Sequence, residues 1–342
     1  MARQLAASQA IPGSRPQRQF SQHYGRPVAA LDLGTNNCRL LVARPASTGF
    51  RVVDAFSRIV RLGEGLEATG ALSEEAVART LDALKVCADK IAYRNIMIGR
   101  YVATEACRRA VNCEVFLAQV RRETGLDIEI ISTSEEARLV VAGCAPLLNP
   151  RIPYALVFDI GGGSTEIVLV RLEGGREVRR RQQIVGSMSL PLGVVTLTDR
   201  FGGEVSPVIY RRMVDEAAEA LARFERDYRI RRHIRTGRTQ MLGSSGTVTT
   251  LAGIHLALPR YIRAAVDGSS LTFDQIAAVS AHLAGLDLAG RAASPCVGRE
   301  RADLVLSGCA ILDAICETWP VGRLRVADRG VREGILFDLI QG

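Results

Sequence analysis

One short unit occurs in both halves of the chain and constrains the fold more than any other feature. It is seen first as ALDLGTNNCRLLV, residues 30–42, and again as VFDIGGGSTEIVLV, residues 157–170. Each copy contains an apolar run typical of a buried strand, an Asp-x-Gly turn at Asp32 or Asp159, and a second apolar run. A strand–turn–strand unit repeated in this way predicts two similar domains, each presenting its turn to a shared cleft.

The turn of the second unit carries three consecutive glycines followed by Ser and Thr. A hairpin turn needs only one or two glycines. Three in a row indicate a backbone left bare so that an anion can approach its N–H groups. Taken alone, a glycine-rich hairpin without a ligand is an equally good interpretation. The alignment of the two units, in which Arg39 matches Glu166, makes that alternative the weaker one.

Strands and helices alternate along the rest of the chain, which is typical of an α/β protein. Ser73 is expected to cap a helix with apolar residues spaced four and three apart from Val77 to Ile91. A strand is expected at about 96–103, a helix at about 113–124 and a further strand at 127–131.

Two more segments carry polar residues that suit a cleft. In STSEEARLVVAG, residues 132–143, Ser134 is expected to cap a helix whose first turn holds Glu135 and Glu136. Acidic residues there favour the helix dipole, which is their simplest explanation. The segment nevertheless lies where the chain crosses between the two units. The second segment, MLGSSGTVTTLAG at 241–253, has the pattern of a strand-to-helix turn whose hydroxyls cap the helix and donate to a ligand.

Composition limits the class of protein. A chain of 342 residues with 47% hydrophobic and 23% charged residues is expected to form about two soluble globular domains. No apolar run approaches the roughly 20 residues that span a bilayer, and no signal peptide is recognisable, so a cytoplasmic location without membrane contact is expected. Residues 1–26 lack a periodic apolar pattern and are predicted to be a disordered basic tail.

The net charge of +8 favours a polyanionic partner. Nearly all of the positive charge is arginine, which binds phosphate bidentately but is explained at least as well by genomic base composition. The arginine runs at 176–183 and 229–235 are expected to be solvated. With only 5% aromatic residues the chain lacks a single-strand nucleic-acid surface, so no nucleic-acid partner is expected. A homodimer is kept as a possible assembly.

Several kinds of site are excluded. The eight cysteines form no CxxC pair and are expected to be reduced core residues. The four histidines have no metal-ligand spacing, and no GxxxxGK[ST] loop is present. Neither a His-based nucleophilic triad nor a His-rich metal site is therefore indicated.

The motifs together resemble the exopolyphosphatase / guanosine pentaphosphate phosphatase (Ppx/GppA) family, in order from about residue 28 to the end. The blocks that carry the resemblance are DLGTNNCRLLV, VRLGEGL, EIISTSEEARL, FDIGGGSTEIV, SLPLGVVTLTDRF, LGSSGTVTTLAG, ERADLVLSGCAIL and VADRGVREGIL. The family belongs to the actin–sugar kinase–Hsp70 superfamily. The resemblance implies two similar actin-like α/β domains flanking a cleft, with a five-stranded sheet in each. The implied boundaries are 27–134 with about 327–342, and 135–326, and the last helix is expected to return to the first domain.

The resemblance also implies the activity. We expect a metal-dependent hydrolase, using Mg²⁺ or Mn²⁺, that releases terminal orthophosphate from inorganic polyphosphate. A short form of the family, without extra C-terminal helical domains, is expected to prefer short to medium chains. Guanosine pentaphosphate 5′-phosphatase is the close alternative, and a catalytically silent polyphosphate or alarmone sensor is a further one. A sugar or carboxylate kinase of the same superfamily is disfavoured by Glu136, which suits activation of water.

Matching the family motifs residue by residue implies the site. Glu136 falls on the general base, Asp159 on the cation-binding carboxylate, and Glu166 on a second essential acid; Asp32 is a further candidate metal ligand. Glu105 departs from the family pattern, which has a small residue such as Ser there, and its carboxylate either repels substrate or pairs with Arg108. The implied phosphate-binding residues are Thr35, Asn36, Arg39, Arg108, Gly161, Gly162, Gly163, Ser164, Thr165, Ser244, Ser245, Gly246, Thr247 and Arg301.

Overall fold

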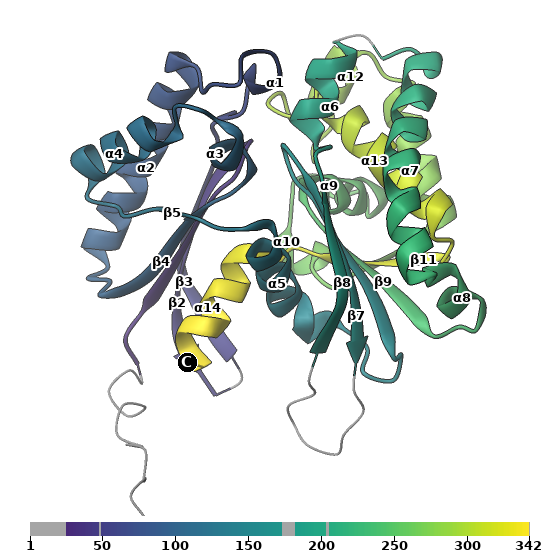
Figure 1. Cartoon of the computed structure of the whole chain (residues 1–342), viewed down its shortest axis with the longest axis horizontal. Helices are drawn as coiled ribbons and strands as arrows, with labels where there is room; N and C mark the ends of the chain where they lie inside the picture. Colours follow the sequence, from purple (N-terminus) through teal and green to yellow (C-terminus); the bar gives the residue numbers. More distant parts are fainter. Residues whose placement is uncertain (1–24, 48, 173–181, 203–204, 342) are drawn as a thin grey trace, which may run out of the picture.

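Two β-sheets lie side by side, with two helices between them (Figure 1). This computed structural model describes residues 25–47, 49–172, 182–202 and 205–341. The tail expected at 1–26 and the arginine run at 176–183 therefore fall almost entirely outside the described residues. The helices between the sheets are α5 (Thr133–Cys144) and α14 (Val331–Gln341). The predicted architecture of two α/β domains is confirmed.

The first sheet has five strands in the order β3-β2-β1-β4-β5. Strands β1, β2 and β3 are antiparallel neighbours, whereas β4 and β5 continue the sheet in parallel with β1. Helices α2 and α4 cover its outer face (Figure 1). The elements of this part are β1 (Val28–Leu33), β2 (Asn37–Ala46), β3 (Gly49–Ile59), α1 (Leu66–Thr69), α2 (Glu74–Tyr93), β4 (Ile98–Ala103), α3 (Glu105–Arg109), α4 (Cys113–Thr124) and β5 (Glu129–Ile130).

The second sheet has six strands in the order β10-β11-β9-β6-β7-β8. The family resemblance implied five strands in this sheet. The additional strand is the three-residue β10, which pairs antiparallel with β11 at the edge of the sheet. The elements are η1 (Ala145–Leu147), β6 (Tyr154–Ile160), β7 (Thr165–Leu172), β8 (Gln182–Leu190), α6 (Val194–Phe201), α7 (Pro207–Tyr228), α8 (Ile230–Arg235), β9 (Thr239–Ser244), α9 (Gly246–His255), α10 (Arg263–Val266), β10 (Ser270–Thr272), α11 (Phe273–Ala284), α12 (Leu288–Ala293), α13 (Val305–Thr318) and β11 (Arg323–Ala327). No helix in the described part of the chain is long and apolar enough to cross a membrane.

The repeated unit forms the same hairpin in both sheets. In the first hairpin, β1 pairs antiparallel with β2 and Asp32 lies opposite Arg39. In the second, β6 pairs antiparallel with β7 and Asp159 lies opposite Glu166. The equivalence inferred from the sequence alignment is confirmed, because matching residues occupy matching positions of the two ladders.

Glycines allow the two central helices to approach closely. A Cβ atom at Gly143 of α5 would collide with the Gly330 carbonyl, and one at Gly334 of α14 would collide with the Leu139 carbonyl. The backbones are therefore in contact, and α14 also packs on β1 of the first sheet. The last helix thus returns to the first sheet, as expected.

Of the two helix caps predicted from the sequence, one is confirmed and one is wrong. Ser73 caps α2, accepting a hydrogen bond from the Ala76 N–H at 3.2 Å. The cap expected at Ser134 is instead Ser132, which accepts from the Glu135 N–H at 3.2 Å, so α5 begins two residues early. The Ser134 hydroxyl only pairs with that of Ser132, because the extended backbone needed at a cap occurs at Ser132.

A buried polar contact joins three helices of the second domain and gives a pH-dependent stability. Asp313 of α13 accepts hydrogen bonds from the hydroxyls of Tyr210 in α7, at 2.6 Å, and Ser280 in α11, at 3.4 Å. Burial raises the pKa of Asp313 to about 6, against the opposing effect of these hydrogen bonds. Because the folded state holds the proton more tightly than the unfolded state, this stabilisation is present below pH about 4 and is lost as the pH rises through about 6.

Asp313→Asn is therefore expected to raise the melting temperature at pH 8 by about 2–4 °C, because asparagine cannot ionise and still accepts a hydrogen bond. At pH 4.5 the gain should be much smaller, since the wild-type carboxyl is then largely protonated. Thermal unfolding followed by circular dichroism at both pH values checks this. An equal difference at the two values would contradict the assigned pKa.

Candidate active site

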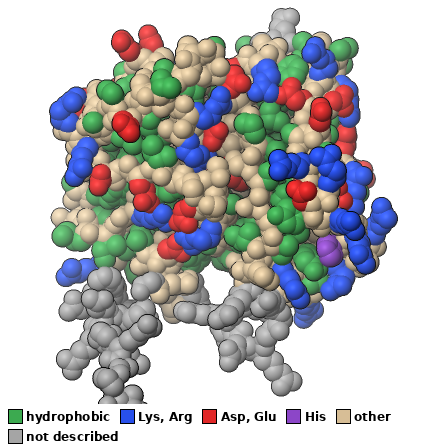
Figure 2. Space-filling view, in the orientation of Figure 1, with side chains coloured by type: hydrophobic (Ala, Val, Ile, Leu, Met, Phe, Trp, Pro, Cys, Tyr) green, Lys and Arg blue, Asp and Glu red, His purple; other side chains and the backbone are tan. Residues whose placement is uncertain are grey.

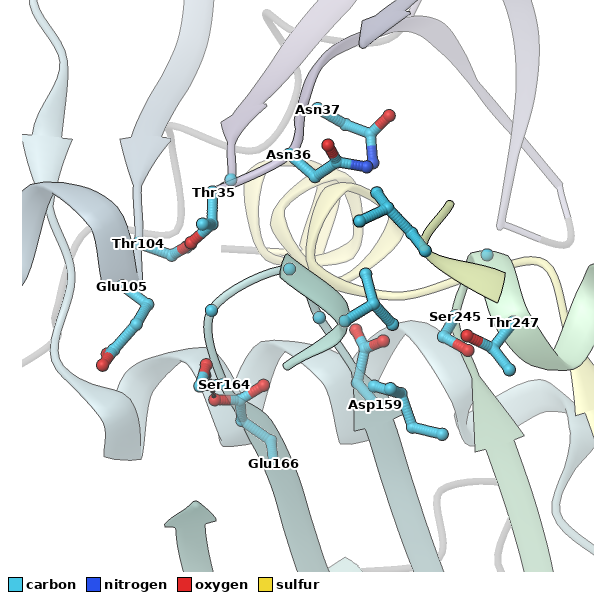
Figure 3. A pocket seen from close by; sticks show the side chains of 18 of the residues that line it. Thr35, Asn36, Asn37, Thr104, Glu105, Asp159, Ser164, Glu166, Ser245 and Thr247 are labelled. Carbon is cyan, nitrogen blue, oxygen red and sulfur yellow. Dashed lines mark hydrogen bonds between the residues drawn. The ribbon is translucent and has the colours of Figure 1, made fainter. Parts of the chain in front are cut away.

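The turns of both hairpins and the start of α9 line one cleft between the sheets. Figure 3 shows Thr35 and Asn36 of the first hairpin facing the glycine loop of the second, with Asp159 and Glu166 on the neighbouring strands β6 and β7. The predicted residues that line this cleft are Asp32, Thr35, Asn36, Arg39, Glu136, Asp159, Gly161, Gly162, Gly163, Ser164, Glu166, Ser245, Gly246, Thr247 and Arg301.

Three residues expected to bind phosphate do not line this cleft. The Thr165 hydroxyl is fully buried and donates to the Leu192 carbonyl at 2.6 Å. The Ser244 hydroxyl donates to the Arg329 carbonyl at 2.6 Å and borders a neighbouring chamber. The Arg108 guanidinium is bound by two carboxylates and a carbonyl. For these three, the family motif located the right part of the fold, but packing decided where each side chain points.

The glycine loop offers bare N–H groups to the cleft. Its turn is closed by a hydrogen bond from the Gly161 N–H to the Ser164 carbonyl at 2.8 Å, while the carbonyls of Gly161 and Gly162 accept from the first N–H groups of α6. The N–H groups of Gly162 and Gly163 donate to no protein acceptor within the described residues. Such unpaired donors beside a helix N-terminus favour an anion.

The loop rests on Gly193, where a side chain would not fit. A Cβ atom at Gly193 would lie 2.6 Å from the Gly163 nitrogen. We expect Gly193→Ala to displace the loop and to lower kcat/KM by at least about 10-fold, since small displacements of positioning groups are costly. Gly285→Ala is the control, because its Cβ would meet only ordinary contacts at 3.5 Å. Steady-state phosphate release measures both variants; equal activity of the two would show that the loop tolerates displacement.

Five carboxylates line the cleft, and burial and mutual repulsion raise the pKa of most of them. Burial, reinforced by the charge of Glu166 and opposed by Arg39, raises the pKa of Asp159 to about 8. Burial also raises the pKa of Glu166, although the hydroxyls of Ser164 and Ser189 donate to it at 2.7 and 3.0 Å. The pKa of Asp32 is raised as well, chiefly by its burial. Such a cluster favours protons or cations.

Glu136 has an unsatisfied oxygen in this setting. The side chain belongs to the first turn of α5, is buried, and lines the cleft. Its Oε2 atom lies 2.8 Å from Nη1 of Arg108 but accepts no well-aligned hydrogen bond in the described structure. Burial and the charge of Glu166 raise the pKa of Glu136 well above its ordinary value, against the opposing effect of Arg108. A buried carboxylate that lines the cleft, is held at one oxygen by an arginine and has a raised proton affinity suits a general base.

The residues present fit a divalent cation that is completed by water and substrate. No group of three or more His, Cys, Asp or Glu side chains in the described residues forms a full ligand set. Asp32 and Asp159 nevertheless both line the cleft and supply the oxygen donors that Mg²⁺ and Mn²⁺ prefer. Mg²⁺ commonly uses only one or two carboxylates together with substrate phosphates and waters. A cation there would also relieve the repulsion that raises the pKa of Asp159.

A chamber of about 600 Å³ adjoins the cleft and concentrates arginine. On the face shown in Figure 2, Lys and Arg are interspersed with Asp and Glu, so the molecule's charge is mixed there. Inside the chamber, burial and the neighbouring charge of Arg39 lower the pKa of Arg301. Burial lowers the pKa of Arg332 too, even though Glu333 opposes it. Arginines that are desolvated and close to one another favour a polyanion. The chamber contains Arg39, Arg58, Arg263, Arg299, Arg301, Arg329 and Arg332.

Sequence reasoning missed most of these arginines. Arg332 lies in the block VADRGVREGIL but was not singled out, and nothing near Arg58 or Arg299 in the sequence distinguishes them from surface arginines. The available signal was the position of Arg329 and Arg332 inside that motif block.

Known proteins resemble this chain over nearly its whole length. Residues 41–341 match the model of the Ppx/GppA phosphatase family. Exopolyphosphatase 2 of Mycobacterium tuberculosis (strain ATCC 25618 / H37Rv) is 32% identical over 330 residues, which are 91% of this chain and 98% of that protein. Guanosine-5′-triphosphate,3′-diphosphate pyrophosphatase of Aeromonas hydrophila is also 32% identical, over 93% of this chain but only 60% of that protein.

Solved structures agree with these matches. The Ppx/GppA family member of Aquifex aeolicus superimposes with a TM-score of 0.73 at 29% identity, covering 92% of this chain and 97% of that one. An exopolyphosphatase of Cytophaga hutchinsonii superimposes with a TM-score of 0.80 over 92% of this chain and 98% of that one; at 23% identity it supports the fold alone.

Proposed function

This chain belongs to the Ppx/GppA phosphatase family, and we propose that it is a metal-dependent hydrolase that releases the terminal orthophosphate of inorganic polyphosphate. The observation that carries the proposal is Glu136: a buried carboxylate lines the same cleft as the unpaired N–H groups of Gly162 and Gly163. This arrangement suits a water molecule held beside a bound phosphate.

Different groups of the chain bind the phosphate, accept the proton and support the glycine loop. The N–H groups of Gly162 and Gly163, with the N-terminus of α9, bind the oxygens of the terminal phosphate. Glu136 accepts a proton as a water oxygen bonds to the terminal phosphorus, and the bridging P–O bond breaks so that the shortened chain leaves with the bridging oxygen. Glu166 holds the Ser164 hydroxyl at 2.7 Å and so supports the loop. A cation held by Asp32 and Asp159 would neutralise charge on the phosphate oxygens.

The chamber beside the cleft supports a substrate with many phosphates. Seven arginines line it, whereas Tyr261 is the one aromatic residue among its described lining. The Tyr261 hydroxyl donates to Asp328 at 2.7 Å. Arginine pairs well with successive phosphates, while a purine ring is usually held by apolar or stacking contacts. The chamber's size suits a short stretch of chain, in keeping with a preference for short to medium polyphosphates.

Guanosine pentaphosphate is the second candidate substrate. The relative of A. hydrophila that bears the pyrophosphatase name is as similar to this chain as the exopolyphosphatase of M. tuberculosis. Both substrates end in a phosphoanhydride that the same cleft can hold.

Phosphate release from polyphosphate of defined lengths, guanosine pentaphosphate and ATP, measured side by side with Mg²⁺, tests the proposal. We expect the highest kcat/KM with polyphosphate. A higher value with guanosine pentaphosphate would select the second candidate. Release from neither substrate, together with retained binding, would identify a catalytically silent sensor and refute the proposal. Glu136→Gln protein prepared in parallel controls for contaminating phosphatases.

A further inference from the structure

Arg108 of α3 is enclosed by two carboxylates and a carbonyl. Its Nε and Nη2 atoms both donate to Oε2 of Glu105, at 3.1 and 2.9 Å. Its Nη1 atom donates to the Ile131 carbonyl at 2.9 Å and lies 2.8 Å from Oε2 of Glu136. The guanidinium is thus held on one side by Glu105 and on another by the main chain.

This anchoring decides how Arg108 meets the general base. One N–H of Nη1 is directed to the Ile131 carbonyl, and Nη1 contacts Glu136 at Oε2 alone, without a well-aligned hydrogen bond. The arginine therefore supplies positive charge beside the buried Oε2 and does not pair with the other oxygen, Oε1, which is left to receive the proton. If Glu105 released it, the guanidinium would be free to rotate and to form a two-point ion pair with Glu136, which is the geometry arginine prefers with carboxylates.

We propose that Glu105 is a positioning residue for the hydrolysis: by binding Nε and Nη2 of Arg108, it limits the Arg108 guanidinium to Oε2 of Glu136 and leaves the other oxygen, Oε1, free for the attacking water. This inference rests on the proposed function, because it assigns Glu136 as the base. The other charged groups that act on Glu136 are Glu166 of β7 and Asp32 of β1, and neither touches Arg108 through a hydrogen bond or ion pair in the described structure.

The position of Glu105 allows one rival explanation. The residue lines the cleft beside the glycine loop, where its Cγ would lie 3.1 Å from a Cβ atom at Gly163 (Figure 3). A carboxylate there would repel an anionic substrate directly. The two explanations differ in kinetics, because repulsion of substrate acts on KM, whereas a misplaced arginine that caps the base acts on kcat.

Glu105→Ser and Glu105→Gln are the informative variants. Serine is too short to hold Arg108. Glutamine keeps an oxygen that accepts the same two hydrogen bonds. We expect Glu105→Ser to lower kcat by about 10-fold with KM within about 2-fold, and Glu105→Gln to retain most of the wild-type kcat. Equal losses in the two variants, or a lower KM with unchanged kcat in Glu105→Ser, would overturn the proposal.

A double-mutant cycle shows whether Glu105 acts through Arg108. Arg108→Met alone should lower activity, and adding Glu105→Ser to it should change kcat by less than about 2-fold, because the group to be positioned is already absent. An undiminished effect of Glu105→Ser in that background would overturn the proposal.

The matched control is Glu135→Ser, which breaks the Glu135–Arg138 pair of α5. Its members are three residues apart, like Glu105 and Arg108, and Glu135 lies outside the cleft. We expect wild-type kcat for this control. Every comparison is made on the substrate that the wild-type enzyme hydrolyses best. Absence of wild-type activity therefore refutes the proposed function, while an active wild type with the wrong variant pattern refutes only the positioning role.

Discussion

Glu136→Gln is expected to lower kcat by about 10²–10⁴-fold, the usual contribution of a positioned general base. The amide has nearly the same shape as the carboxyl group but cannot take a proton from water. Because Arg108 keeps its contacts with Glu105 and the Ile131 carbonyl when Glu136 is replaced by a neutral amide, the substitution breaks little that holds the fold together. The rate of phosphate release at saturating substrate measures the effect, and the melting temperature should change little.

Glu135→Gln is the like-for-like control for Glu136→Gln. The two residues are adjacent in α5, but Glu135 forms ion pairs with Arg100 and Arg138 and does not line the cleft. Loss of activity in both variants would indicate damage to the helix. A folded Glu136→Gln protein with near-normal turnover would mean that Glu136 serves only the helix dipole.

Removal of divalent cations is expected to abolish activity, and Mg²⁺ or Mn²⁺ should restore it. The physical reason is the cluster of carboxylates: Asp32 and Asp159 line the same cleft, and the burial and repulsion that raise the pKa of Asp159 to about 8 also oppose binding of an anionic phosphate. A divalent cation bound by these carboxylates would take the place of the protons that they otherwise hold. It would also make the local charge more positive, which favours the phosphate. Phosphate release in EDTA, followed by titration with each metal, measures the dependence; full activity in chelator would falsify it.

Asp159→Asn tests the same site without chelator. Because the raised pKa shows that the folded protein disfavours the charged form of Asp159, the neutral amide should be tolerated and the melting temperature should not fall. Activity at ordinary Mg²⁺ concentrations should nevertheless fall by at least about 10²-fold, since a carboxylate ligand is lost. A variant as active as the wild type would show that Asp159 does not hold the cation.

Much of the fold could be predicted because local patterns encode it. The apolar runs on both sides of the turns at Asp32 and Asp159 define two hairpins. The pairings Asp32–Arg39 and Asp159–Glu166 follow from the hairpin geometry. The first residue of α5 could not be predicted from the sequence, because Ser132 and Ser134 have the same capping chemistry and differ only in backbone conformation. The short edge strand β10 gave no signal, since three residues are too few for a period.

By itself, the sequence determined the repeated hairpin and the two α/β domains, because these depend on residue types at short, regular spacings. The carboxylates of the cleft were predicted through the resemblance to the Ppx/GppA family. The tertiary structure alone decided what Arg108 binds, since Glu105, Ile131 and Glu136 reach it from three different segments of the chain. It likewise decided that Arg58 and Arg332, far apart in sequence, line one chamber. Hydrophobic periodicity specifies which face of an element is buried, but the direction of a charged side chain is set by the partners that packing brings within hydrogen-bonding distance.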